Sequence, residues 1–291
     1  MPGSLSSRRE KILVLALPVA FLLAFVVIPL LNVFYYSLWS LDPVTGLMKP
    51  SLTLKNYIEF FSKTLYLEIL RRTAEITVLA TAIGLVVAYP IAYYVAILAD
   101  KTWQPMLLFL IILPFWSSLL IRTFSWMTVL RENGFLDRLL LDLGLVSAPL
   151  SLLYSKTAVV IGLVHVFLPF MILPIYASLR NLDLALLEAA RDLGATPLRA
   201  FVRVTLPLSL PGVAAGVLLF GLPAFGAFIT PKLLGGTGDV MIGNVIEIQF
   251  KGIFNWPLGA SVAALVTVLM LAGAFVFRRV IGVRPWDAQT Q

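Results

Sequence analysis

Long apolar stretches, separated by short polar connections, constrain this chain more than any other feature. A helix needs about 20 consecutive apolar residues to cross the hydrocarbon core of a bilayer. Six stretches are long enough, at residues 12–38, 74–98, 105–130, 157–179, 208–230 and 257–277. Only 13% of the residues are charged, about half of the usual share in a soluble domain, so the chain cannot cover a globule in water. The sequence therefore predicts an all-α membrane protein with six transmembrane helices.

The first stretch is expected to be a retained anchor rather than a signal peptide. Arg8, Arg9 and Lys11 precede it, as basic residues precede a signal core. Its apolar run, however, greatly exceeds the roughly 7–15 residues of such a core, and no small-residue cleavage site follows. We therefore predict an N-terminal region of residues 1–66 (tail, first span and periplasmic loop), a transmembrane domain of residues 67–279, and a tail of residues 280–291.

The distribution of lysine and arginine predicts which side of the membrane each connection faces, because cytoplasmic connections carry an excess of basic residues. With both termini in the cytoplasm, 11 basic residues over 59 positions fall on that side, in segments 1–11, 99–104, 180–207 and 278–291. The opposite side has 10 over 87 positions, in loops 39–73, 131–156 and 231–256. Topology also explains the net charge of +7 better than nucleic-acid binding, because the basic residues are scattered over segment ends.

Several chemistries are excluded by what the chain lacks. It has no cysteine and one histidine, which excludes disulfides, thiolate chemistry and multi-histidine metal clusters. It has no Gly-x-x-x-x-Gly-Lys-Ser/Thr loop, so it does not hydrolyse a nucleotide by the common phosphate-binding route. An ion-coupled carrier usually has carboxylates near the membrane midplane, whereas Glu75 is expected near the outer end of the second span. We predict a passive conduit with no catalytic residue, metal or bound cofactor; a self-sufficient carrier or channel is the alternative.

Glycine and proline recur in the predicted spans. Prolines stand at positions 90, 114, 169, 174, 211 and 223, and small residues line Gly212–Gly216 and Gly221–Gly226. Such residues allow helices to bend and to approach closely, which suits a bundle that changes shape. Ordinary packing of a helical bundle explains them equally well.

A charged segment, residues 180–207, interrupts the apolar chain between the fourth and fifth stretches; we call it the elbow. Asp183 is placed to cap a helix over residues 184–193, and Gly194 follows where a glycine commonly ends a helix. Thr196 and Pro197 then predict the start of a second helix. The elbow is therefore expected to be a helix–glycine–helix connection between two spans.

The first helix of the elbow is amphipathic. Three apolar residues share one face and three charged residues share the other: Leu186, Ala190 and Leu193, and Glu188, Arg191 and Asp192. We expect another protein to bind this connection. The alternative for Glu188 is an ordinary solvated acid, paired with a residue three or four positions later.

The elbow resembles the Glu-Ala-Ala loop of binding-protein-dependent ABC importer permeases. That loop has Glu-Ala-Ala, a glycine four residues on and Leu-Pro about a dozen residues later, and this chain matches with Glu188, Ala189, Ala190, Gly194, Leu206 and Pro207. The resemblance implies the type I importer permease fold of the maltose and methionine importers. It also implies that a cytoplasmic ATPase docks on the elbow through Glu188, Ala189, Ala190, Asp192, Gly194 and Pro207.

Further segments resemble the spermidine/putrescine permeases of that family: Leu113–Trp126, Asn133–Gly134, Leu143–Leu145, Leu168–Pro174, Leu233–Gly236, Ile242–Phe250 and Trp256–Pro257. The resemblance implies a multi-pass inner-membrane subunit that imports polyamines by alternating access. Its implied partners are a second permease subunit, two cytoplasmic ATPases that hold ATP and magnesium, and an extracytoplasmic binding protein, periplasmic or lipid-anchored. Subgroups of the family that transport iron, sulfate, thiamine or aminoethylphosphonate share the elbow, and these solutes are the alternative substrates.

A polyamine is a flexible polycation, so its path should offer carboxylates and aromatic faces. The candidates are Glu75, Tyr89, Tyr93, Tyr94, Trp116 and Trp126, with interfacial anchoring as the alternative for the aromatic residues. Two more polar residues of the spans are expected to be structural: Arg122 in a salt bridge or backbone contact, and His165 in a hydrogen bond inside the bundle. Charges of the outer loops are candidates for rim contacts with the binding protein, or are simply solvated: Asp137, Arg138, Lys232 and Asp239.

Overall fold

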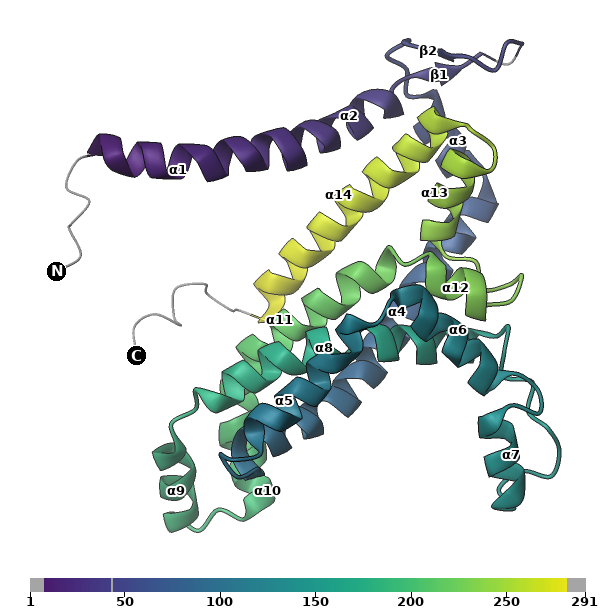
Figure 1. The fold of residues 1–291 in the computed structure, drawn as a ribbon. Helices are drawn as coiled ribbons and strands as arrows, with labels where there is room; N and C mark the ends of the chain where they lie inside the picture. Colours follow the sequence, from purple (N-terminus) through teal and green to yellow (C-terminus); the bar gives the residue numbers. More distant parts are fainter. Residues whose placement is uncertain (1–7, 43, 282–291) are drawn as a thin grey trace. The chain divides into compact units, whose positions relative to one another are not determined.

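The computed structural model describes residues 8–42 and 44–281, most of which are helical (Figure 1). Packing divides these residues into two units. One combines the residues up to Thr64 with Ile246–Val268, and the other combines Leu65–Val245 with the residues from Leu269 onward. The predicted domain division at residues 66 and 279 rests on the sequence and stays a prediction.

The first unit begins with the first predicted span. This span is built from α1 (Arg8–Leu22), the π-helical η1 (Leu23–Val27) and α2 (Ile28–Ser37). An antiparallel hairpin of β1 (Ser40–Leu41) and β2 (Met48–Lys49) follows, in which Ser40 pairs with Lys49 and Leu41 with Met48. The short helix α3 (Lys55–Ser62) completes this part of the chain.

The second unit holds most of the remaining helices. In chain order the elements are α4 (Thr64–Tyr93), η2 (Tyr94–Leu98), α5 (Gln104–Ile112), η3 (Leu113–Trp116), α6 (Leu119–Leu130), α7 (Phe135–Asp142), α8 (Lys156–Arg180), α9 (Leu184–Asp192), α10 (Pro197–Ala200), η4 (Phe201–Thr205), α11 (Leu206–Phe225), α12 (Ile229–Leu234), α13 (Ile242–Lys251) and α14 (Trp256–Ile281). The division between the two units falls within α13 and again within α14.

Among the described residues, five helices are long and apolar enough to cross a membrane, or six if one bent pair counts as a single span. Three of them match the predicted stretches to within two residues at each end: Val14–Ser37, Lys156–Arg180 and Trp256–Arg279. The helices Thr64–Leu98 and Pro197–Phe225 begin well before their apolar stretches do. The second of these has 29 residues and so rises about 43 Å, more than the roughly 30 Å hydrocarbon core. Its polar first turns therefore extend out of the bilayer.

The third predicted span, residues 105–130, is wrong as one continuous helix. Its two halves, Gln104–Trp116 and Leu119–Asp142, meet at an angle of 94°. Ser117 and Ser118 between them are extended, and the Ser118 hydroxyl oxygen accepts the backbone N–H of Leu120 at 3.3 Å, which begins α6. An N-cap serine makes a new helix start favourable where the old one has ended. Pro-x-x-Ser-Ser is the sequence signal for this break.

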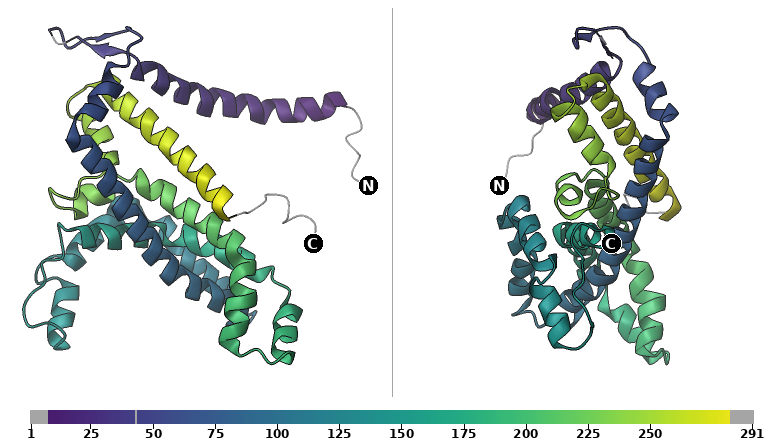
Figure 2. Two further views of the ribbon diagram at one scale, coloured as in Figure 1. Left: turned by 180° about the vertical axis from the view of Figure 1, so that it is seen from behind. Right: turned by 90° about the vertical axis from the view of Figure 1, so that its right-hand side faces the viewer.

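The core of the second unit lies along the seam where α8 and α11 pack side by side (Figure 2). A Cβ atom on Gly212 would lie 2.4 Å from Cβ of Ser178 and 2.6 Å from the carbonyl oxygen of Pro174, and one on Gly216 would lie 2.9 Å from the carbonyl oxygen of Met171. The absence of side chains at these two positions therefore allows the two backbones to approach, as predicted. Prolines do not break these helices: α8 continues through Pro169 and Pro174, and α11 through Pro211 and Pro223.

Candidate functional site

The elbow begins as the sequence predicts. Its first helix, α9, starts after Asp183, whose Oδ1 accepts the backbone N–H of Ala185 at 3.0 Å. This N-cap satisfies one of the backbone donors that a helix start leaves without a partner. The helix ends at Asp192, so Leu193 is its C-cap rather than its last residue.

Gly194 reverses the chain at the end of α9. Its φ is +80°, in the left-handed region that residues with a Cβ rarely adopt. The Gly194 N–H donates to the carbonyl of Arg191 at 2.8 Å, and the Ala195 N–H donates to the carbonyl of Ala190 at 3.0 Å. These two bonds form the Schellman motif that closes a helix. A Cβ at Gly194 would have nothing within 4 Å, so the position requires glycine for its conformation and not for space.

The second half of the elbow is continuous with a membrane span. Thr196 caps α10, with its hydroxyl oxygen accepting the backbone N–H of Arg199 at 3.4 Å, and Pro197 occupies the first turn. The chain then passes through the π-helical η4 into α11, and the Leu206 N–H donates to the carbonyl of Phe201. The wider turn accommodates Pro207, which has no N–H to donate. Figure 1 shows α9 and α10 at the end of this long helix.

The exposed face of the elbow differs in part from the predicted one. Helix α9 packs against α10 and η4, and Leu187 is buried, whereas Leu186 and Leu193 are 48% and 89% exposed. Leu198 on α10 is also exposed. Glu188 is exposed, and no ion pair of Glu188 occurs in the described part of the chain. The elbow thus presents apolar side chains among charged ones, which is the composition of a protein–protein contact surface.

Two predicted pathway residues, Tyr89 and Tyr93, connect α4 to the elbow's second half. Both rings lie 5.7 Å from the Phe201 ring, nearly edge-on. The Tyr89 hydroxyl lies 2.8 Å from the Ser209 hydroxyl, and Ser209 uses its own proton to donate to the carbonyl of Leu206. Tyr89 therefore donates this hydrogen bond. The sequence did not predict this contact, because residues 120 positions apart form it.

The structure does not bring the predicted pathway residues Glu75, Tyr89, Tyr93 and Trp116 together. Glu75 is already paired with two cations, at 2.9 Å from Arg71 and 3.7 Å from Lys156. It is separated from Tyr89 by 14 positions of α4, a rise of about 21 Å. Trp116 is 77% exposed beside the break of the third span, with its ring against Phe109. A pathway function for these residues stays a prediction.

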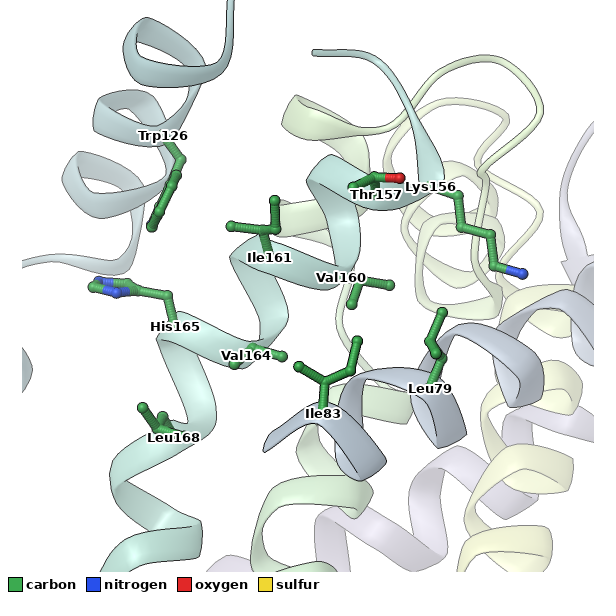
Figure 3. Close-up of a pocket in the computed structure, with 10 residues that line it drawn as sticks. All are labelled: Leu79, Ile83, Trp126, Lys156, Thr157, Val160, Ile161, Val164, His165 and Leu168. Carbon is green, nitrogen blue, oxygen red and sulfur yellow. The ribbon is translucent and has the colours of Figure 1, made fainter. Parts of the chain in front are cut away.

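A groove of about 520 Å³ lies between α4, α6 and α8 (Figure 3). Its lining is mostly apolar: Leu79, Ile83, Trp126, Lys156, Thr157, Val160, Ile161, Val164, His165 and Leu168. The Trp126 and His165 rings meet edge-on at 5.6 Å. The lining contains one predicted pathway residue, Trp126, and no carboxylate, and its cation Lys156 lies 3.7 Å from Glu75.

The expected contacts of Arg122, His165 and Asp137 are not those observed. Nε and Nη1 of Arg122 are buried without a hydrogen-bond partner among the described residues, and the His165 ring packs edge-on against the Trp126 ring. Asp137 is 2% exposed and accepts the backbone N–H groups of Asn133 at 2.8 Å and Leu150 at 2.7 Å. Asp137 therefore closes its own loop, and the prediction of a rim contact is wrong for it.

Comparisons with known proteins agree with the elbow motif. The family described as binding-protein-dependent transport system inner membrane component matches residues 8–283. The spermidine/putrescine transport system permease protein PotB of Escherichia coli (strain K12) is 42% identical over 252 residues, which cover 87% of this chain and 90% of that protein. This is similarity over nearly the whole length of both proteins.

Two solved structures resemble the chain. One is a bacterial alginate ABC transporter in complex with an alginate pentasaccharide-bound periplasmic protein, with a TM-score of 0.72, 17% identity and 94% of each chain covered. The other is the MetNI methionine ABC transporter in an inward-facing conformation, with a TM-score of 0.58, 18% identity, 75% of this chain and 96% of that chain covered. The predicted type I importer permease fold is confirmed by this likeness.

Proposed function

The chain belongs to the family of binding-protein-dependent transport system inner membrane components, and we propose that it is the permease subunit of an ATP-driven polyamine importer. It is a multi-pass inner-membrane transport subunit rather than an enzyme. The identity of 42% over 87% of the chain to a spermidine/putrescine permease is the observation that supports polyamines as the substrate class.

The chain is proposed to form half of the translocation pathway, beside a second permease subunit. Two cytoplasmic ATPases would hold ATP and magnesium, and a solute-binding protein would deliver the substrate to the opposite face. The lack of carboxylates in the groove of Figure 3 supports a pathway that needs residues from a second subunit. Both termini and the elbow would then lie in the cytoplasm, as the basic residues predict.

The elbow is the proposed docking site for one ATPase. Exposed Leu186, Leu193 and Leu198 would form the apolar centre of this contact, and Glu188, Arg191 and Asp192 its charged part. Motion imposed on α9 and α10 would enter the membrane along α11, because α10, η4 and α11 form one continuous helix. This geometry converts ATPase closure into movement of a span and gives alternating access a physical route.

The test is uptake of radiolabelled spermidine and putrescine by proteoliposomes that contain the complex co-purified with this chain. We expect uptake that requires ATP inside the vesicles and the loaded binding protein, and that persists when the proton gradient is dissipated. Glu188→Lys should leave membrane insertion intact while uncoupling ATP hydrolysis from uptake. Glu188→Asp, which keeps a carboxylate at the same exposed position, serves as the control and should retain uptake.

Three outcomes would overturn parts of this proposal. If no nucleotide-binding subunit co-purifies and uptake follows the proton gradient, the chain is a secondary carrier. If ATP drives uptake of iron, sulfate, thiamine or aminoethylphosphonate but not of polyamines, the substrate class is wrong while the importer assignment stands. If Glu188→Lys transports like the wild-type chain, the elbow is not the coupling element.

A further inference from the structure

The helix α3 has three distinct sides. One side is buried, at Asn56 and Phe60. A second is charged or polar and exposed, at Lys55 and Ser62, with Glu59 beside them. The third carries large apolar side chains that are largely exposed: Leu54 at the N-cap (61%), Ile58 (65%) and Phe61 (57%). Because these three stand four and three positions apart, they form one stripe along the helix.

Hydrogen bonds fix α3 to the end of the first span. The Asn56 amide donates to the backbone carbonyls of Ser37 at 2.9 Å and Trp39 at 2.7 Å. The Tyr57 and Ser37 hydroxyls are 2.7 Å apart, and Ser37 donates its own proton to the carbonyl of Phe34, so Tyr57 is the donor to Ser37. Since Ser37 is the last residue of the apolar span, α3 lies at the depth where that span leaves the bilayer.

Aromatic side chains mark the same depth. Tyr35, Tyr36 and Trp39 surround the end of the span, with ring centroids 4.9–6.1 Å apart. Tyrosine and tryptophan are enriched at the membrane–water boundary, where their rings meet acyl chains and their polar atoms meet water. The bonds of Asn56 and Tyr57 therefore hold α3 beside an interfacial aromatic cluster.

We propose that α3 is an interfacial helix that inserts Leu54, Ile58 and Phe61 into the lipid leaflet at the hairpin end of the first span. An amphipathic helix at this depth buries its apolar face at the boundary between headgroups and acyl chains. Its polar side then faces headgroups and water, with Glu59 and Lys63 joined at 2.6 Å and Lys55 free to meet lipid phosphates. The inserted stripe would anchor the end of the first span against vertical displacement while the rest of the permease changes shape.

The chain contains no cysteine, so single cysteines can be introduced for spin labels. The test places nitroxides at Ile58→Cys and Phe61→Cys in the full complex, in vesicles of phosphatidylethanolamine and phosphatidylglycerol, with cysteines of the partner subunits blocked or replaced. Glu59→Cys, about 100° around the helix from Ile58 on its polar side, is the control. Collision with oxygen reports lipid, and collision with a water-soluble nickel chelate reports water.

We expect the ratio of oxygen to nickel collisions to be several-fold higher at positions 58 and 61 than at position 59. Low collision rates with both reagents at 58 and 61 would mean that protein covers the stripe, and would overturn the proposal. High nickel collision would mean that water covers it, with the same consequence. Asn56→Ala should lower the ratio at position 58, since the helix loses its bonds to the span; an unchanged ratio there would show that Asn56 does not set the depth. Uptake by each labelled complex confirms that the variant is folded.

Discussion

The seam between α8 and α11 gives the sharpest test of the structure. In Gly212→Ala, the new Cβ would lie 2.4 Å from Cβ of Ser178 and 2.6 Å from the carbonyl oxygen of Pro174. Ordinary contacts begin near 3.4 Å, so the two helices must separate by about 1 Å locally. Overpacking of this kind typically costs about 1–3 kcal/mol. Part of that cost is offset because alanine favours a helix over glycine by up to about 1 kcal/mol.

Gly221→Ala on the same helix is the control, because its Cβ would meet only Thr81 Oγ1, at 3.6 Å. The assay is reversible unfolding in mixed micelles of a mild detergent and sodium dodecyl sulfate. We expect Gly212→Ala to lose up to about 2 kcal/mol and Gly221→Ala to be neutral or slightly stabilised. Equal stability of the two variants would refute the close approach of α8 and α11 at Gly212.

A second substitution tests whether Ser178 causes the loss. Ser178→Gly removes one of the two obstructing groups but leaves the Pro174 carbonyl, so it should restore only part of the stability lost in Gly212→Ala. In a double-mutant cycle the combined change should therefore be less destabilising than the sum of the single changes. Additive effects would show that the two residues are not in contact.

Other positions test the elbow, its link to α4 and the hairpin. Gly194→Val should abolish most ATP-driven uptake without preventing insertion, since a left-handed conformation costs a β-branched residue about 1–2 kcal/mol or more. Gly194→Asn should retain uptake, because asparagine adopts this conformation more readily. Equal losses of uptake in the two variants would contradict a conformational cause. Tyr89→Phe should lower the free energy of unfolding by about 0.5–1.5 kcal/mol by removing the hydrogen bond to Ser209, with the KM for spermidine unchanged. A raised KM would instead indicate that the Tyr89 hydroxyl contacts the substrate. Hydrogen bonding from Lys49, and then from the N–H groups of residues 44 and 45, lowers the pKa of Asp42 below its ordinary 3.8. The ionised form of Asp42 therefore stabilises the hairpin above pH 3.8, and this stabilisation is lost as pH falls below 3.8. A spin label at Leu47→Cys should keep its mobility from neutral pH down to that value and become more mobile below it. If the same label is equally pH-sensitive in an Asp42→Asn variant, Asp42 is not the origin of the effect.

Local signals predicted the elbow almost to the residue. Asp183, Gly194 and Thr196 each act on backbone groups a few positions away, so their effect is written in the neighbouring sequence. Apolar run length likewise predicted where spans occur, because the bilayer sets that length. The start of α4 at Thr64 was not predicted, and neither was the continuity of the helix from Pro197 into the fifth span, since polar turns of a helix and polar loops have similar composition.

Contacts between residues that lie far apart along the chain could not be predicted from the sequence. Asp137 is acidic and stands in a polar connection, which is typical of a solvated residue, yet its carboxylate binds backbone N–H groups on both sides of its loop. Tyr89 and Glu75 were predicted from chemistry alone to attract a cation, and both have partners supplied by other parts of the second unit. Residue type indicates what a side chain can bind, whereas the fold decides which partner reaches it first.

Hydrogen bonding also indicates where the permease can bend. Helix α11 is continuous with the elbow, and the seam at Gly212 and Gly216 couples it tightly to α8, so we expect these two helices to move as one body. The prolines inside α8 and α11 do not interrupt these helices. The chain between α5 and α6, in contrast, turns by 94° at Ser117 and Ser118, where helical hydrogen bonding is already interrupted, so it can bend there more easily. Spin-label distances should therefore stay constant between Ala177→Cys and Leu210→Cys when ATP binds the complex, and should change between Met106→Cys and Ser125→Cys. A change across the seam as large as that across the break would show that the prolines, and not the break, act as the hinge.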